Sequence, residues 1–290
     1  IPDPGTTMNA LIAGEIDFWE TPSPDLVPGM EGNPDITIKV IDPLGTQGWL
    51  RPNHLNPPFD NAKARQALLH MVKQEDYLQA IIGDQKFWRA CAAYFMCDTP
   101  LDTDIGAGPL MNQDLDEARR LLKEGGYNGE TLILMDPTDI PVLHGASLVT
   151  ASMLRKIGAK VEVQAMDWST LTSRRAETKS IADGGWNIFH TYSTGADVAS
   201  PIANIGVSGG CVEEAWFGWP CDKTLEDLRD QFSRESDPAK QVEIGIALQK
   251  RAYEVVPYVN YGQWFQPTAY RSSLKGVLIS PVPFFWNISK

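Results

Sequence analysis

The chain has 290 residues, of which 43% are hydrophobic and 21% are charged, and this composition is ordinary for a globular protein of one large or two ordinary domains. Its formal net charge of −12 argues against binding to nucleic acid or to anionic membrane surfaces, because both attract clusters of Lys and Arg. No apolar run approaches the roughly 18 residues that a membrane-spanning helix needs. Residues 1–5 contain neither an initiator Met nor a signal peptide, so we expect a processed chain or a fragment.

The first fifty residues are predicted to form a short α/β unit. Hydrophobic spacing indicates helices at residues 6–14 and 25–32 and strands at residues 16–19, 36–41 and 48–51. This unit has no evident closure of its own, which suggests that a partner segment is missing upstream.

The next region is more helical. We predict helices at residues 61–72 and 76–82, and little periodicity over residues 84–113. Asp114 and Glu117 then form the pattern of a capping box, followed by a helix that ends at Gly125.

From residue 131 strands and helices alternate, which predicts right-handed crossovers and a sheet flanked by helices. The expected strands are residues 131–135, 160–165, 186–189, 256–265 and 274–279. The expected helices are residues 144–157, 168–177, 225–233 and 239–255.

The strand at residues 186–189 is predicted to run into a loop of small and polar residues that reaches Asp197. Ligands collect at the carboxyl ends of strands in α/β sheets, so this loop is a candidate binding site. The alternative is a core strand followed by a solvated loop. His190 lies beside the loop and either contacts a ligand or is a hydrogen-bonded histidine at the end of the sheet.

The four cysteines form two pairs that are close in sequence, Cys91 with Cys97 and Cys211 with Cys221. Neither pair has the Cys-x-x-Cys spacing of zinc or redox sites, so each is expected to close a small loop as a disulfide in an oxidising compartment. Other pairings, and four free thiols, remain alternatives. The nine Trp residues, spread along the chain, suit a protein that closes over a ligand.

Enzymatic and metal chemistry find little support. The sequence has no Gly-x-Ser-x-Gly elbow, P-loop or Gly-x-Gly-x-x-Gly, and its four histidines are isolated. We therefore expect no enzyme, no cofactor and no metal site. Arg174 and Arg175 make a local positive spot suited to clamping a carboxylate, although a solvated helix end is an equal alternative.

Four stretches of the chain have the form of known motifs, the longest being residues 53–68, NHLNPPFDNAKARQAL, and the others residues 9–17, 116–127 and 154–168. The longest resembles the signature N…PPFDDxRVRQAL of the large extracytoplasmic solute-binding proteins that deliver dipeptides, oligopeptides or nickel to ABC importers (family 5). The other three resemble further motifs of the same family, in the same order. The resemblance covers essentially the whole chain.

The resemblance implies a periplasmic-binding-protein-like (type II) fold of two α/β lobes that close over a solute by a hinge. This chain would then hold one lobe, with a mixed sheet flanked by helices, and part of the other. Residues 1–52 resemble the last part of the first lobe, residues 53–265 the whole second lobe, and residues 266–290 a return across the hinge.

By this resemblance the chain is the periplasmic or otherwise extracytoplasmic solute-binding component of an ABC importer, a monomer that captures a small peptide or similar solute and docks on the importer's membrane subunits. The alternatives are a hydrolase of small acyl or glycosyl substrates in the same cleft, and a solute-sensing docking protein. In peptide-binding relatives an Asp directly after Trp-Thr-Gly holds the ligand ammonium, whereas here Tyr192-Ser193-Thr194-Gly195 is followed by Ala196 and only then Asp197. Either a displaced Asp197 meets a cation or the ligand carries none.

The expected ligand-facing residues have aromatic, small polar or charged side chains. Arg174, which matches a family position, would orient an anionic ligand end, and Trp168, Tyr192 and Trp264 would pack the solute. The full set is Trp168, Arg174, His190, Tyr192, Ser193, Thr194, Gly195, Asp197 and Trp264.

Overall fold

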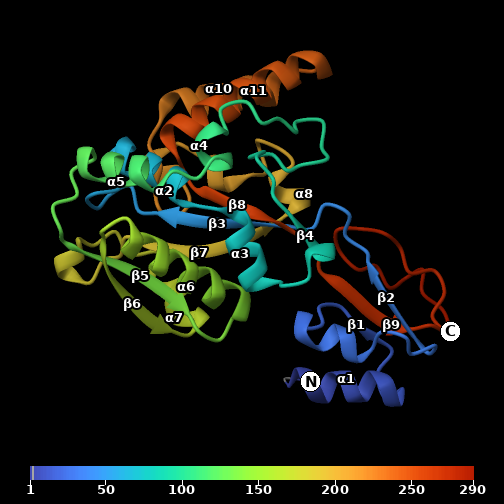
Figure 1. Ribbon diagram of the computed structural model, residues 1–290. Coiled ribbons are helices and arrows are strands. Elements are labelled where there is room, and N and C mark those ends of the chain that lie inside the picture. The colour runs from blue at the N-terminus through green and yellow to red at the C-terminus, as the bar shows by residue number, and fades with distance from the viewer. Residues whose placement is uncertain (2) are drawn as a thin grey trace.

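Two β-sheets organise the chain in the computed structural model, which describes residue 1 and residues 3–290. The large sheet has six strands in the order β4-β8-β3-β7-β5-β6, and the small sheet has three in the order β1-β9-β2. Figure 1 shows the small sheet set apart from the large one, with both chain ends beside it. The two sheets and the helices around them divide the molecule into a large unit and a small unit.

The large sheet is mixed. Strand β5 runs parallel to β6 and β7, whereas β3 pairs antiparallel with β7 and β8, and β4 pairs antiparallel with β8. This confirms the predicted α/β class with a mixed sheet. The strands are β3 (Thr46–Pro52), β4 (Trp88–Arg89), β5 (Thr131–Pro137), β6 (Lys160–Met166), β7 (Ile188–Thr194) and β8 (Val259–Trp264).

Helices cover both faces of the large sheet. Side chains alternate along β5, so that Leu132 and Leu134 join the core beneath α6, while Ile133 and Met135 join a second core beneath α7. The helices of this unit are α2 (Ala62–Met71), α3 (Gln74–Ile81), α4 (Gly108–Met111), α5 (Leu115–Glu124), α6 (Pro141–Lys156), α7 (Trp168–Arg174), α8 (Gly195–Val198), α9 (Cys211–Glu214), α10 (Lys223–Arg234) and α11 (Pro238–Val255).

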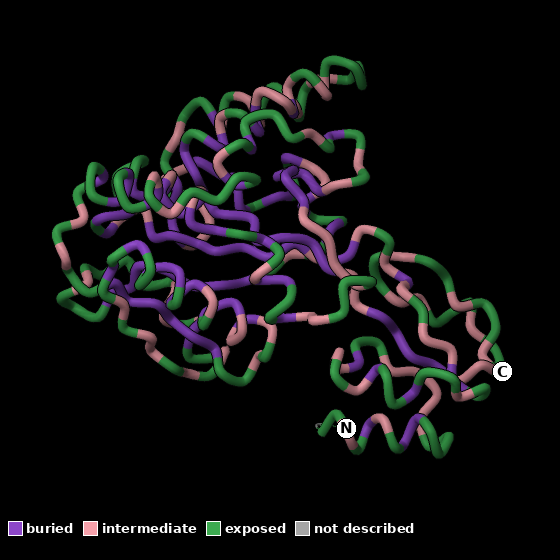
Figure 2. The backbone as a smooth tube through the Cα atoms, in the orientation of Figure 1, coloured by how far each residue is buried: buried purple, intermediate pink, exposed green. Residues whose placement is uncertain are grey.

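The small unit has its own core of Leu11, Met30, Ile36 and Ala269. Its elements are α1 (Pro4–Ala13), β1 (Phe18–Trp19), the 3-10 helix η1 (Pro24–Gly29), β2 (Ile36–Val40) and β9 (Pro267–Arg271). Figure 2 shows that the remaining C-terminal segment is exposed or half-buried, in contrast to the buried strands of the large sheet.

Two short connectors join the units. Residues 41–45 lead from β2 to β3, and residues 265–266 lead from β8 to β9. Strand β3, within the residues 1–52 that resemble the last part of the first lobe, pairs in the large sheet.

Several elements differ from the prediction. Residues 274–279 lie within the described part of the chain but form no strand, and only an isolated bridge joins Lys275 to Ser289. Strand β9 was not predicted, and the helix expected at residues 25–32 is the 3-10 helix η1. Asp114 caps α5 by accepting the amides of Asp116 and Glu117, but the Glu117 carboxylate pairs with Arg120 instead of completing the box.

Both predicted disulfides are present, Cys91–Cys97 and Cys211–Cys221. No helix formed by residue 1 or residues 3–290 is long and apolar enough to cross a bilayer.

Candidate ligand-binding site

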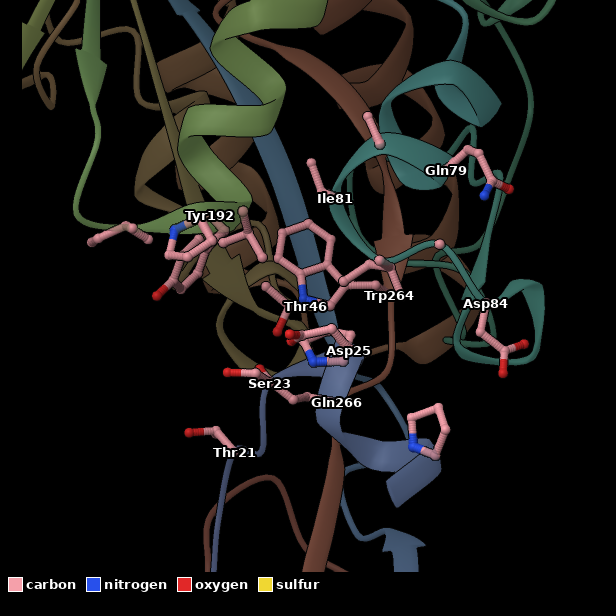
Figure 3. A pocket seen from close by; sticks show the side chains of 18 residues that line it. Thr21, Ser23, Asp25, Thr46, Gln79, Ile81, Asp84, Tyr192, Trp264 and Gln266 are labelled. Carbon is pink, nitrogen blue, oxygen red and sulfur yellow. The ribbon is translucent and has the colours of Figure 1, made fainter. Parts of the chain in front are cut away.

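A cavity of about 670 Å³ lies between the small and the large unit. Its volume is in the range of sites that hold a small organic ligand. One wall comes from the loop and η1 of the small unit, at Thr21, Ser23 and Asp25, and the other from α3, the start of α6, Tyr192 and Trp264 (Figure 3). The cavity therefore lies where a solute would touch both units at once.

Two aromatic rings form part of the large unit's wall. Tyr192, near the end of β7, is 45% exposed, whereas Trp264, at the end of β8, is only 2% exposed. The Trp264 ring stacks on Tyr261 at 6.3 Å and is therefore fixed from behind. The cavity wall thus combines an exposed Tyr192 ring with a buried Trp264 ring.

The charged residues that line the cavity are both acidic. Asp84 accepts the backbone amide and the ammonium of Lys86, and these hydrogen bonds lower its pKa. The carboxylate of Asp25 has no hydrogen-bond or ion-pair partner among the residues described. Asp25 is exposed to solvent, so its carboxylate is accessible from the cavity.

A second cluster, on the opposite face of the large sheet, surrounds the guanidinium of Arg175. Its central carbon lies 4.7 Å from the ring centre of Phe217, 5.0 Å from Trp216, 5.3 Å from Trp168 and 5.8 Å from Phe189. The Arg175 Nε is buried and has no partner among the described residues, and desolvation lowers the pKa of the group. We call Trp168, Phe189, Trp216 and Phe217 the aromatic frame.

The helix α7 explains this position. Arg175 is the C-cap residue of α7, and its guanidinium lies beside the ring of Trp168, the first residue of that helix. The Trp168 amide donates to Asp139 in the loop after β5, which anchors that end of the helix at the carboxyl edge of the parallel strands.

Arg174 points elsewhere. Its Nη2 donates to the carbonyls of Gly184 at 3.2 Å and Gly185 at 3.5 Å, which precede β7. At about 3.3 Å per residue, this is roughly 20 Å along the strand from Tyr192. The structure does not bring Arg174 together with Tyr192 and Trp264, and neither Arg174 nor Arg175 is among the residues that line the cavity.

His190 lies in the core and not beside the cavity. It is fully buried, with its Nε2 2.9 Å from the Thr150 hydroxyl and its Nδ1 3.3 Å from the Ser147 hydroxyl. Desolvation lowers its pKa to about 3, so the ring is neutral. The structure thus favours the alternative reading of a hydrogen-bonded histidine.

The polar stretch after His190 is not a free loop. Strand β7 continues through Ser193 to Thr194, because these residues pair with β3, and Thr194 then caps α8. The Thr194 hydroxyl donates to the carboxylate of Asp197, and the Asp197 amide donates back to Thr194. The Gly195 amide donates to the Gly45 carbonyl at 2.6 Å, so this stretch supports a connector and, apart from Tyr192, does not line the cavity.

No metal site is found: among the described residues no group of three or more His, Cys, Asp or Glu is arranged to hold an ion.

Comparison with known proteins decides the family. The sequence profile described as "Bacterial extracellular solute-binding proteins, family 5 Middle" matches residues 1–211. The chain belongs to this family. The family assignment confirms the resemblance that the motifs indicated and places the chain among extracytoplasmic binding proteins.

Individual relatives agree with this assignment. The probable peptide ABC transporter periplasmic-binding protein y4tO of Sinorhizobium fredii (strain NBRC 101917 / NGR234) is 35% identical over 99% of this chain and 54% of its own length. The oligopeptide-binding protein AppA of Bacillus subtilis (strain 168) is 24% identical over 100% of this chain and 54% of its own length. The chain thus spans about half the length of the curated relatives that it matches, and neither of these two is described as a hydrolase.

Solved structures of the family share the fold. The ABC transporter substrate-binding protein CtaP of Listeria monocytogenes aligns with a TM-score of 0.82 and 18% identity, covering 94% of this chain and 54% of that chain. The periplasmic binding protein DppA of Helicobacter pylori, in complex with the peptide STSA, aligns with a TM-score of 0.80 and 22% identity, covering 99% of this chain and 55% of that chain.

Sequence reasoning missed several residues of this site. Asp25 follows a Pro-rich turn and carried no motif, and Arg175 was passed over for its neighbour Arg174. Trp216 and Phe217 lie in the aromatic run Trp216-Phe217-Gly218-Trp219 between two cysteines, and that run was a usable signal.

Proposed function

We propose that this chain is part of the solute-binding component of an ABC importer, and that it captures a small peptide or similar solute for delivery to the membrane subunits. The observation that carries the proposal is the cavity of about 670 Å³ between two units that each have a separate core. A site shared by two units allows binding to be coupled to their closure.

We further propose that the units divide at residues 41–45 and 265–266, as parts of two lobes, and that the protein acts as a monomer without covalent chemistry. The presence of distinct cores on either side of these connectors supports the division. The sequence similarity to binding proteins of transporters supports the absence of catalysis.

In this proposal a solute packs against Tyr192 and Trp264, and a cationic group of the solute faces Asp25. Arg175 lies on the opposite face of the sheet and does not line the cavity, and it is our candidate, in place of Arg174, for an anionic group that extends beyond the cavity. A guanidinium held among aromatic rings and lacking an acid partner keeps its charge and offers its free edge to a carboxylate. Peptides and related zwitterions carry both groups.

The proposal is tested by thermal unfolding of the 290-residue chain, and of any longer natural form, with libraries of short peptides, sugars and metal chelates. Peptides should raise the unfolding midpoint, since ligand at about 100 times its Kd adds about 2.7 kcal/mol of stability. Asp25→Asn and Tyr192→Ala should reduce this shift. The matched control Asp227→Asn, on the exposed face of α10, should not. A shift that is absent for every library, or equal in all variants, would contradict the proposal.

A further inference from the structure

Arg51, on β3, is a fully buried cation whose hydrogen-bond partners are all backbone carbonyls. Its Nε donates to Phe217 at 2.6 Å and its Nη2 to Trp216 at 3.2 Å. Its Nη1 donates to Gly206 at 2.5 Å and to Pro257 at 3.0 Å. Burial lowers the pKa of this arginine to about 9. A buried charge without an acid partner is costly, so its presence points to a requirement for geometry.

Trp216 lies between Arg51 and Arg175. The central guanidinium carbon is 5.3 Å from the Trp216 ring centre for Arg51 and 5.0 Å for Arg175. Phe217 connects the same pair, since its carbonyl accepts from Arg51 while its ring lies under Arg175. The backbone of these two residues is therefore held by one arginine, and their rings frame the other.

The loop that carries these rings is tightly constrained. The Cys211–Cys221 disulfide closes it, and the His54 amide donates to the Gly218 carbonyl at 2.8 Å. Gly218 has a φ of +97°, and a Cβ there would lie 2.8 Å from the Arg51 Nε. The loop thus follows the guanidinium of Arg51 closely, with no room for a larger residue at position 218.

We propose that Arg51 is a positioning residue for solute binding, which sets the rings of Trp216 and Phe217 and through them the orientation of the Arg175 guanidinium. The inference rests on the proposed function, in which Arg175 receives the carboxylate of the solute. A bidentate contact requires the guanidinium plane to be fixed, because both N–H groups must face the carboxylate together. The aromatic frame fixes that plane, and Arg51 fixes two members of the frame.

The test observes Arg175 directly, by NMR of its Nε–H and Cδ–H protons in the 290-residue chain, with sodium acetate as the carboxylate probe. The neighbouring rings should shift these protons from free-arginine values. In Arg51→Lys, which keeps the charge but loses the planar fork, the shifts should move toward free-arginine values and the acetate Kd should weaken roughly tenfold or more. The matched control is Arg65→Lys, since Arg65 is also buried but donates to Phe59 and Val255 and to no residue of the loop. That variant should leave the Arg175 shifts and acetate binding unchanged.

Unchanged Arg175 shifts in folded Arg51→Lys would overturn the inference. If this variant fails to fold, Trp216→Leu replaces it, because the proposed path runs through that ring, and unchanged Arg175 shifts and acetate binding there would equally overturn the inference. A wild-type chain whose Arg175 signals ignore acetate would overturn the anion-binding role in the proposed function and the inference with it. In that case, Arg175 chemical shifts that change in the Arg51 or Trp216 variants would show only that Arg51 orders the loop.

Discussion

The ring of Tyr192 meets the ring of Trp264 edge-on, with the centroids 5.8 Å apart and the planes at 78°. The two residues share a cavity wall but differ in burial, because Tyr192 is 45% exposed and Trp264 is 2% exposed. In the proposed function, we expect a solute between the units to move the Tyr192 ring more readily than the Trp264 ring.

Substitution should separate these roles. Trp264→Ala should lower the free energy of unfolding by about 3–5 kcal/mol, because it empties a core position. Tyr192→Ala should change it by less than about 1 kcal/mol while weakening ligand binding. Urea unfolding and calorimetric titration with a peptide identified by thermal shift would measure both. An equal loss of stability in the two variants would contradict this assignment.

Arg175 and Arg174 form a natural matched pair for the anionic end of the ligand. Arg175→Leu should weaken binding of a carboxylate ligand about 10- to 100-fold, since a hydrogen bond to a charged group contributes about 1.5–3 kcal/mol. A form of the same ligand with its C-terminal carboxylate replaced by an amide should lose much less affinity in this variant. Arg174→Leu should leave both affinities nearly unchanged, because its guanidinium caps the carbonyls of Gly184 and Gly185. The reverse pattern would restore Arg174 as the anchor.

His190 predicts a loss of stability in acid. Its folded-state pKa of about 3 lies below the ordinary value of 6.5, so between these values the unfolded chain binds more protons than the folded one. Stability from this group is complete above about pH 6.5 and falls by up to about 1.4 kcal/mol for each pH unit below it. Urea unfolding at pH 7 and pH 4.5 should show a smaller difference for His190→Gln than for the native chain. If the free energy of unfolding changed equally with pH in the native chain and in His190→Gln, the His190 ring would not be the cause of the acid sensitivity.

Each disulfide should stabilise the fold by reducing the conformational entropy of the unfolded chain. Their sequence separations are 6 and 10 residues, and closing loops of this size is expected to contribute about 2–3 kcal/mol. Dithiothreitol should lower the thermal midpoint in the native chain. Removing one pair at a time, as Cys91→Ser/Cys97→Ser or Cys211→Ser/Cys221→Ser, should give part of that decrease. If dithiothreitol left the thermal midpoint of the native chain unchanged, the disulfides would not contribute to its stability.

Local pattern was sufficient for most of the fold. Alternation and 3.6-residue spacing located β5, β6 and α11, and glycines marked the end of α1 at Gly14. Strand β9 was not predicted, because Pro267 and a run of mixed polarity give it no regular alternation of polar and apolar residues. Its pairing with β1 and β2 also joins segments about 230 to 250 residues apart in the chain. Pairing over such distances cannot be read from a local window.

The candidate site was less predictable for a related reason. Tyr192 and Trp264 were predicted to face a ligand, and both line the cavity, because β7 and β8 end at the same edge of the sheet and each residue lies at or near the end of its strand. The polar stretch from Ser193 to Asp197 has the composition of a binding loop, yet pairing with β3 and the cap of α8 occupy it. Composition does not reveal whether a polar group is already bonded within the protein.

The two connectors between the units constrain how a solute could be released. Residues 41–45 and 265–266 run between the same pair of sheets, and the Gln263 side chain donates to the Leu44 carbonyl, which fastens one connector to the strand that feeds the other. We expect two short connectors held together in this way to favour rotation of one unit against the other about the line that joins them. A distance measured across the cavity mouth should then report that rotation.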